Sequence, residues 1–482
     1  MDSQSNRRSA TAQGHETGPY PACVLSEGTI RKVLDAALAG GGELAELFVE
    51  NRTSSGLRLD DSKVEDVASG AEMGAGIRLV SGEGAAYAYT NVLEEPALLE
   101  AAAVVRARGS GRDKEIDLRR VRPSLVNPVE VDPDAVEVSE KADALRAADD
   151  SARSSGDAVR QVTASYMDVH QKVLIANSDG LLVEDDRTRV RFFVQVVAAR
   201  DGQIATGFEG PGHSGGFELL TRRPAPAVGA KAAQKALAML EAQPSPAGEF
   251  PVVLAPGSGG VLIHEACGHG LEADTLVKQA SVYAGRQGER FASEAVTVVD
   301  DGSDVGTWGS FGVDDEGTPS QRTVLFDRGV LVGHMSDLRS AKKIEHPPTG
   351  NGRRQSYAHL PIVRMTNTYL LPGADKAGDI IAGVERGVYA ANFAGGEVNP
   401  ATGNFVFGMS EAYMIENGAI AYPIRGANLI GNGPQVLGAI EAIGDDFGRL
   451  EGVCGKDGQH APVTNGMATV LLSRMTVGGT QT

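Results

Sequence analysis

The 482-residue chain has few of the features that mark secreted, membrane-spanning or nucleic-acid-binding proteins. Its three cysteines, Cys23, Cys267 and Cys454, are odd in number and far apart, which argues against a disulfide framework. It contains no apolar run of about 18 residues and no N-terminal apolar segment of the signal-peptide kind. With 45 basic and 63 acidic residues, its formal charge of −18 disfavours contact with phosphate backbones. We therefore expect a cytoplasmic protein that binds neither membrane nor nucleic acid.

Glycine, in contrast, is abundant, and its distribution indicates a β-rich architecture. The 61 glycines lie between short apolar runs and follow no triplet period, so they predict many turns rather than a collagen-like or low-complexity chain. Residues 1–23 are predicted to form a disordered tail. From 24 to 242 the periodicity predicts a helix followed by four short strands, and then the same order again. This pattern predicts an α+β domain with an internal duplication.

A Pro-bearing stretch at 243–250 is predicted to be a linker to a second domain, because proline ends the preceding helix. Residues 251–482 contain short apolar segments separated by Gly and Asn-Gly turns, such as the one within 416–419. This pattern is typical of a twisted antiparallel sheet, barrel or sandwich that carries a few helices.

The densest concentration of chemically active residues lies in the segment 254–274, LAPGSGGVLIHEACGHGLEAD. A strand is predicted to end at Pro256, and a Gly/Ser turn then leads into a helix that carries His264, Glu265 and His269. Neutral imidazoles are good zinc ligands, and a zinc site with an open position can lower the pKa of a bound water to about 7. The adjacent glutamate could accept the proton of that water.

The two histidines are five residues apart, whereas the familiar H-E-x-x-H pattern places them four apart. At about 100° per residue, this spacing separates them by roughly 140° around a regular α-helix, too far to share one metal ion. A metal site therefore requires a π-bulge or a distorted turn, which Gly268 and Gly270 would permit. The alternative is a partly buried helix with two histidines and an unrelated glutamate.

The run HEACGHGLEAD resembles the HExxxH segment of the TldD/PmbA family, which includes proteins called modulators of DNA gyrase. It is most similar to the TldD-type subunits, since the PmbA-type (TldE) partners lack this metal motif. The resemblance continues through SVYAGRQGERFASEAVTVVDDG, DDEGTPSQRTVL, PTGNGRRQSYAHLPIVRMTNTYLLPG, GGEVNPATGNFVFGMSEAYMIENG and EGVCGKDGQHAPVTNG. These segments cover most of 250–470, and the N-terminal half matches in organisation and length more than in motifs.

This resemblance implies a zinc metallopeptidase that accepts unfolded or peptide-like substrates in an enclosed cleft. It implies that His264 and His269 bind zinc, that Glu265 is the general base and that Cys454 of the GxCGK segment is the third ligand. A thiolate is a strong zinc ligand, although Cys454 could also be a small buried apolar residue. Cys267 is interpreted as a packing residue. The expected partner is a PmbA/TldE-like subunit in a heterodimer, or a second copy of the chain in a homodimer.

A Gly-rich basic loop, PTGNGRRQSYAHLP, offers further candidates for substrate binding. Arg353, Tyr357 and His359 could bind a substrate carbonyl or the developing oxyanion. The plainer alternative is a structural loop whose arginines pair with the carboxylates at 314–316. The stretch GSGG at 257–260 lacks the GK[ST] ending of a phosphate loop and is interpreted as a strand-to-helix turn.

The leading functional hypothesis is therefore a zinc peptidase that acts on unstructured polypeptides. A non-catalytic peptide-binding subunit, which would grip extended segments by strand addition, is the alternative. The presence of Glu265 argues against it, because a pure binder has no need of a general base. A dipeptidyl-peptidase of the HExxxH kind would need a second helical motif with a glutamate ligand, and none is evident. Direct binding to DNA conflicts with the negative charge.

Overall fold

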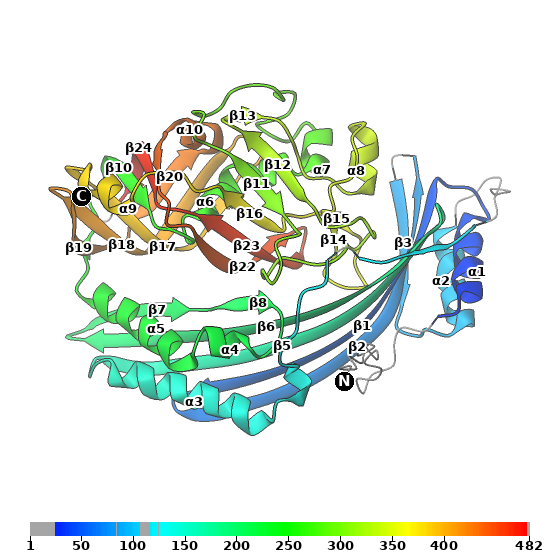
Figure 1. The fold of residues 1–482 in the computed structure, drawn as a ribbon, viewed down its shortest axis with the longest axis horizontal. Helices are drawn as coiled ribbons and strands as arrows, with labels where there is room; N and C mark the ends of the chain where they lie inside the picture. The colour runs from blue at the N-terminus through cyan, green and yellow to red at the C-terminus, as the bar shows by residue number, and fades with distance from the viewer. Residues whose placement is uncertain (1–24, 83, 107–115, 124, 480–482) are drawn as a thin grey trace, which may run out of the picture.

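The computed structural model describes residues 25–82, 84–106, 116–123 and 125–479, so the tail expected at 1–23 lies outside the described residues. The described chain forms a mixed α+β fold, as the sequence predicts. A long curved sheet from the N-terminal half lies against a β-rich C-terminal half, and Figure 1 shows the two stacked on one another. Among the described helices, none combines the length and apolarity needed to cross a bilayer.

The N-terminal half consists of two similar units, each with a helix, two long strands, a shorter third strand and a further helix. Its elements are α1 (Glu27–Leu38), β1 (Leu44–Asp60), β2 (Lys63–Ser81), β3 (Gly84–Thr90), α2 (Glu95–Val105), β4 (Arg119–Val121), η1 (Pro133–Ala135), α3 (Val138–Ser154), β5 (Val159–Asn177), β6 (Leu181–Arg200), β7 (Gln203–Glu209), β8 (Gly212–Ser214), α4 (Leu219–Arg222) and α5 (Ala225–Leu240). The order β3-β2-β1-β5-β6, with β7 on β6, joins the units at the antiparallel β1–β5 pair. This arrangement is the duplication that the sequence predicts.

In the first unit three strands replace the four predicted, and β1 and β2 are longer than expected. Two of the four short strands that the periodicity predicts in this unit, at 44–52 and 55–61, form the single strand β1. The polar residues between them remain in the sheet because β1 has a neighbour on each side: Thr53 pairs with Ala71 of β2 and with His170 of β5. Pairing on both edges satisfies the backbone there, so the polar side chains do not end the strand.

The two faces of this sheet have different partners, because successive side chains of a strand point to opposite faces. Leu47 and Val49 of β1 belong to a core with α1 and α2, and Leu57 and Leu59 belong to one with α3 and α5. On the opposite face, Phe48 packs with Val313 of the C-terminal half. The helices therefore cover one face of the sheet and the C-terminal half covers part of the other (Figure 1).

The C-terminal half contains a small barrel and a six-stranded sheet. Its elements are β9 (Gln243–Pro244), β10 (Gly248–Leu254), α6 (Gly260–Ile263), η2 (His264–Gly268), η3 (His269–Leu271), α7 (Ala273–Val277), β11 (Val298–Asp301), β12 (Arg322–Asp327), β13 (Val330–Leu331), α8 (Leu338–Lys343), β14 (Gly352–Arg353), β15 (Ile362–Val363), β16 (Asn367–Leu370), α9 (Ala377–Ala382), β17 (Arg386–Val398), β18 (Asn404–Glu416), β19 (Ala419–Arg425), β20 (Asn428–Asn432), α10 (Gly433–Gly438), β21 (Ile440–Ile443), β22 (Gly448–Lys456), β23 (Gln459–Met467) and β24 (Val470–Gly478). The order β17-β10-β24-β20-β18 closes on itself because β17 also pairs with β18. The other sheet has the order β13-β12-β11-β16-β23-β22.

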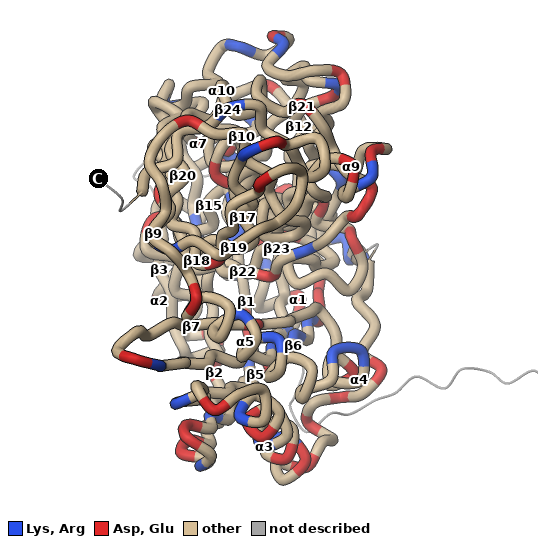
Figure 2. The backbone as a smooth tube through the Cα atoms, turned by 90° about the vertical axis from the view of Figure 1, so that its left-hand side faces the viewer, with Lys and Arg blue, Asp and Glu red and all other residues tan. Residues whose placement is uncertain are grey.

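One continuous apolar core lies between the barrel and the six-stranded sheet. It includes Leu254 of the barrel, Val298 of the six-stranded sheet, and Ala266 and Cys267 of η2. The segment that carries the two motif histidines is therefore built into this core. Figure 2 shows the barrel end of the molecule above the N-terminal sheet, with acidic and basic residues interspersed around α3 and α4.

The segment 243–250, predicted to be a linker, is part of the C-terminal β structure. Gln243 and Pro244 form β9, which pairs with β19, and β10 begins at Gly248. Proline is compatible with this position because β9 lies at the end of the strand order and has a single neighbour. The chain therefore passes from α5 into the second half through a short paired segment.

Candidate metal centre

The turn that leads into the histidine segment is shaped by glycines, as the sequence interpretation expects. Gly257 has φ of +74°, a backbone conformation that favours glycine. A Cβ atom on Gly260, the first residue of α6, would lie 2.6 Å from the backbone nitrogen of Gly466 in β23. The absence of a side chain at Gly260 thus allows α6 to pack directly against β23 of the six-stranded sheet.

The helix is irregular at the two histidines. After the single turn of α6, residues His264–Gly268 form the π-helical turn η2, and a 3-10 turn then begins at His269. Because a π turn takes more residues than an α turn, it brings side chains five apart toward the same side. The ring centroids of His264 and His269 are 5.0 Å apart, with the rings perpendicular. This is the distortion that the five-residue spacing requires.

Cys454 of β22 completes a cluster of three potential ligands. Its Sγ atom lies 3.3 Å from Nε2 of His264 and 3.5 Å from Nε2 of His269, and the three atoms lie within 4.8 Å of one another. The side chains come from segments 185 residues or more apart in the sequence. His264 and Cys454 are 4% and 7% exposed, so the cluster is recessed from the surface.

A buried carboxylate orients the second histidine. Glu272 Oε2 lies 3.0 Å from Nδ1 of His269, which directs Nε2 toward Cys454. Lys456 Nζ lies 3.0 Å from the same carboxylate oxygen and 2.8 Å from Asp274. Although burial raises the pKa of Glu272, His269 and Lys456 lower it to about 2. Sequence reasoning did not identify Glu272, although its position three residues after His269 was an available signal.

Glu265 lies beside the donor atoms, on the Nε2 side of His269. Its Oε2 lies 3.9 Å from Nε2 of His269, and its side chain is 18% exposed, so water can reach it. Burial raises the pKa of Glu265, while His264 and His269 oppose this effect. A carboxylate whose pKa is raised is a stronger base, so Glu265 is suited to accept a proton.

The two described cysteines have opposite environments. Burial raises the pKa of the Cys454 thiol, but His264 and His269 more than compensate and lower it to about 4. Cys267 is fully buried, its thiol lies 3.0 Å from the carbonyl oxygen of Ile263, and burial raises its pKa to about 12. The geometry therefore brings Cys454 to the histidines and keeps Cys267 in the apolar core.

The basic loop does not join this cluster; it contacts the N-terminal sheet. Arg354 Nη2 lies 2.5 Å from Glu46 of β1 and 2.7 Å from the carbonyl oxygen of Asp315. The Tyr357 amide donates to Glu50, and Nδ1 of His359 lies 2.9 Å from the Ser356 hydroxyl.

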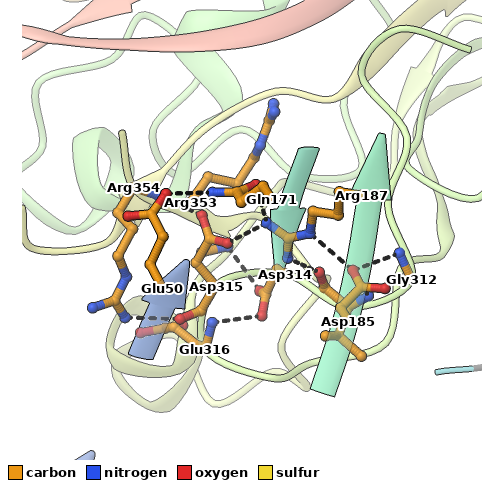
Figure 3. A network of polar contacts seen from close by, with 12 residues as sticks. Glu50, Gln171, Asp185, Arg187, Gly312, Asp314, Asp315, Glu316, Arg353 and Arg354 are labelled. Carbon is orange, nitrogen blue, oxygen red and sulfur yellow. Dashed lines mark hydrogen bonds and ion pairs between the residues drawn. The ribbon is translucent and has the colours of Figure 1, made fainter. Parts of the chain in front are cut away.

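Arg353 donates to the carbonyl oxygens of Met365 and Pro462. The backbone amides of Gly352 and Arg354 in the loop donate to Asp314 and Asp315, respectively (Figure 3). The carboxylates at 314–316 therefore hold the backbone of the loop, whereas its arginines bind Glu46 and carbonyl oxygens, which differs from the arginine–carboxylate pairs expected in the plainer alternative.

The π turn is held in place by a close approach from α10, and this contact can be tested. A methyl group on Gly433 would lie 2.1 Å from the carbonyl oxygen of Ala266, which also accepts a hydrogen bond from Tyr283. We expect Gly433→Ala to lower the free energy of unfolding by about 1–3 kcal/mol, the usual cost of overpacking. The measurement is urea-induced unfolding.

Gly378→Ala is the matched control, because a methyl group there meets no atom within 4 Å and the residue lies in the helix α9. Alanine favours a helix by about 1 kcal/mol over glycine, so this variant should be as stable as the parent or more so. Equal stability of the two variants would contradict the proposed crowding at η2.

Comparison with known families identifies three consecutive matches along the chain. Residues 45–108 match domain 1 of the PmbA/TldA metallopeptidases, 131–240 match the central domain, and 247–479 match the C-terminal domain. The Haemophilus influenzae metalloprotease TldD homolog is 38% identical, over 95% of this chain and 97% of its own length. The Saccharolobus solfataricus zinc metalloprotease TldD homolog is 36% identical, over 48% of this chain and 52% of its own.

Solved structures share the fold at low sequence identity. A Thermotoga maritima protein described as a candidate modulator of a DNA gyrase has a TM-score of 0.75 and 23% identity, covering 90% of this chain and 96% of its own. TldE from Thermococcus kodakarensis has a TM-score of 0.72 and 19% identity, covering 94% of this chain and all of its own.

Proposed function

Because the chain belongs to the PmbA/TldA metallopeptidase family, as a metalloprotease similar to TldD, we propose that it hydrolyses unfolded or short polypeptides at the His264–His269–Cys454 cluster. The observation that carries this proposal is the convergence of three donor atoms beside Glu265. A subunit that only binds peptides would have no use for a carboxylate at that position.

The donor set suits zinc. Two imidazole nitrogens and one thiolate are the borderline-soft ligands that zinc prefers, and three protein ligands are typical of a catalytic site with an open position. The described residues offer no hydrogen-bond partner to the buried Nδ1 atom of His264, whereas Nδ1 of His269 is held by Glu272. The similarity to the Saccharolobus solfataricus protein, which is named a zinc metalloprotease, supports zinc as the metal. When bound, zinc would polarise the peptide carbonyl and make water more acidic.

The chain's own residues would then move the proton. Glu265 is close enough to the cluster to accept a proton from a water there and to return it to the leaving amine. Glu272 and Lys456 are positioning residues, because their contacts fix the orientation of His269 and touch no reacting atom. The recessed position of the cluster limits access to extended chains.

Metal content tests the ligand assignment. We expect about one zinc ion per chain in the wild-type protein, loss of most of it in His264→Ala/His269→Ala, and weakened binding in Cys454→Ser. Cys267→Ser is the matched control, since Cys267 lies outside the cluster, and it should retain zinc. Elemental analysis after dialysis gives the result, and stoichiometric zinc in the double variant would refute the assignment.

We further propose that the protein works as an assembly, with a TldE-like subunit or with a second copy of itself. The likeness of the whole chain to a TldE structure supports this proposal, because subunits of one fold can pack in equivalent ways. Light scattering of the purified chain, alone and with a TldE-like protein from the same organism, distinguishes the two assemblies.

We also propose that the boundary between the N-terminal and C-terminal domains lies near 243–250.

A further inference from the structure

A cavity separate from the His264–His269–Cys454 cluster lies between the N-terminal sheet and the C-terminal half, and its lining is strongly basic. It has a volume of about 270 Å³, and five arginines but only one carboxylate, Asp315, line it. In a chain with a net charge of −18 this is an unusual local excess of positive charge. The cavity brings together β1, β5, β6, the basic loop and the β22–β23 hairpin, which are distant in sequence.

Asp315, the one carboxylate in the lining, already binds two arginines of the wall. Asp315 lies 2.6 Å from Arg187 and accepts the Arg354 amide at 2.8 Å (Figure 3). Arg187 also pairs with Asp185, and Arg354 pairs with Glu46. These arginines are therefore neutralised by protein carboxylates, and they form the fixed part of the wall.

Two other arginines of the wall lack a carboxylate partner among the described residues. Arg189 donates to the carbonyl oxygens of Trp308 and Ser310, and Arg353 donates to those of Met365 and Pro462. Both are more than nine-tenths buried, at 7% and 5% exposure. Burying a charge without an opposite charge is costly, so both side chains would be stabilised by an anion in the cavity.

The pKa values of Arg189 and Arg353 are both lowered, as expected for guanidinium groups that are buried without a paired carboxylate. Burial and the neighbouring guanidinium groups lower the pKa of Arg189 to about 9. Burial lowers the pKa of Arg353 to about 10, although Asp315 opposes this effect. A third arginine of the wall, Arg52 of β1, is half-buried and interacts electrostatically with Glu50, and no hydrogen bond to its side chain is seen among the described residues.

The rest of the lining indicates a peptide rather than an inorganic anion. Met167 of β5 and Val453 of β22 are 40% and 51% exposed and form an apolar wall together with Pro462. Phe311 lies beneath the guanidinium groups of Arg187 and Arg353, at 5.4 and 5.2 Å. A phosphate or sulfate ion has no apolar surface to bury here, whereas a residue next to a carboxylate does.

The cavity also adjoins the strand that carries the candidate ligand Cys454. Successive residues of β22 point to opposite faces, so Cys454 points to the histidines while Val453 lines the cavity. We infer that this cavity binds a carboxylate group of the peptide substrate, held by Arg52, Arg189 and Arg353 on the far side of β22 from the metal cluster. This inference rests on the proposed peptidase function. The carboxylate can come from the C-terminus or from an Asp or Glu side chain.

The chain contains a built-in reporter for this cavity. Trp308 is its single tryptophan, it lines the cavity, and its indole N–H donates to Gly452 of β22. We would titrate the full-length chain, as purified and after chelation, with alanine tetrapeptides that end in a carboxylate or an amide. A third peptide carries an internal glutamate and an amide end. Trp308 fluorescence is the readout, and it does not depend on hydrolysis.

The carboxylate peptide should change the fluorescence and saturate, and the amide peptide should bind at least about tenfold more weakly, since it loses a charge-assisted hydrogen bond. Binding of the internal-glutamate peptide would identify a side-chain carboxylate as the source. Arg52→Gln and Arg353→Lys should each weaken carboxylate binding by about tenfold. Arg58→Gln, on the same strand but outside the cavity and paired with Asp60, should bind like wild type.

Equal binding of the carboxylate and amide peptides would overturn the inference, as would wild-type binding by both Arg52→Gln and Arg353→Lys. Acetate that binds as tightly as the peptide would also overturn it, because the cavity would then take a free anion. Hydrolysis of both peptides without discrimination leaves the peptidase proposal standing and removes this one. If the chain binds the carboxylate peptide more tightly than the amide peptide but hydrolyses neither, this inference stands and the peptidase proposal falls.

Discussion

Replacing Glu265 by glutamine is expected to abolish peptide hydrolysis while the chain keeps its fold and its metal. Glutamine has nearly the same shape as glutamate but cannot accept the proton of a water molecule at neutral pH. A positioned general base contributes roughly 100- to 10,000-fold to a rate, so the variant should lose at least about 100-fold. Initial rates on an unstructured peptide, measured at saturating zinc, give the comparison.

Glu272→Gln is the matched control for this experiment. Glu272 is also a carboxylate of the same segment, but it contacts His269 Nδ1 and Lys456 rather than the open side of the cluster. Loss of such a supporting carboxylate typically weakens metal binding by about 10- to 100-fold. Added zinc should therefore restore the activity of Glu272→Gln and leave Glu265→Gln inactive. Rates close to wild type in Glu265→Gln would show that another group accepts the proton.

The local backbone geometry at His264 and His269 could be predicted from the sequence because it depends on residue spacing. Histidines five residues apart can share one side of a helix only if the helix has a π-bulge or a distorted turn, and the structure has a π turn at His264–Gly268. Similarly, the Asn-Gly pair in 416–419 predicts a tight turn, and Asn417 and Gly418 both have positive φ there. Cys454 came instead from the family resemblance, since nothing in its own segment points to residues 185 or more positions earlier.

Features that depend on distant partners were beyond sequence reasoning. The polar stretch in the middle of β1 resembles a break between two strands, and only its pairing with both β2 and β5 keeps it extended. The basic loop could not be assigned because Glu46 and Glu50, which bind it, lie about 300 residues earlier. The arginine-lined cavity has no motif at all, because each of its walls comes from a different part of the chain.

Folded proteins are expected to resist this enzyme by more than about a thousandfold relative to unfolded chains of the same sequence. The candidate ligands and Glu265 are recessed, with side-chain exposures of 13% for His269 and 18% for Glu265. A peptide bond inside a folded domain can reach them only after unfolding, which costs about 5–15 kcal/mol. Each 1.4 kcal/mol is about tenfold, so even the lower end gives this suppression.

The test uses one stable domain and a destabilised variant of it that is unfolded under the same conditions. Both are incubated with the enzyme, together with a TldE-like subunit if the assembly requires one, and cleavage is followed by mass spectrometry. Because the two substrates differ by a single core substitution, sequence preference is the same in both and only the unfolding cost differs. The unfolded variant should be cleaved about as fast as a short peptide. Equal rates for the stable and unfolded forms would mean that folded segments reach the cluster. A sharp preference for one residue type across a peptide library would mean that side-chain recognition, rather than access, selects the substrate.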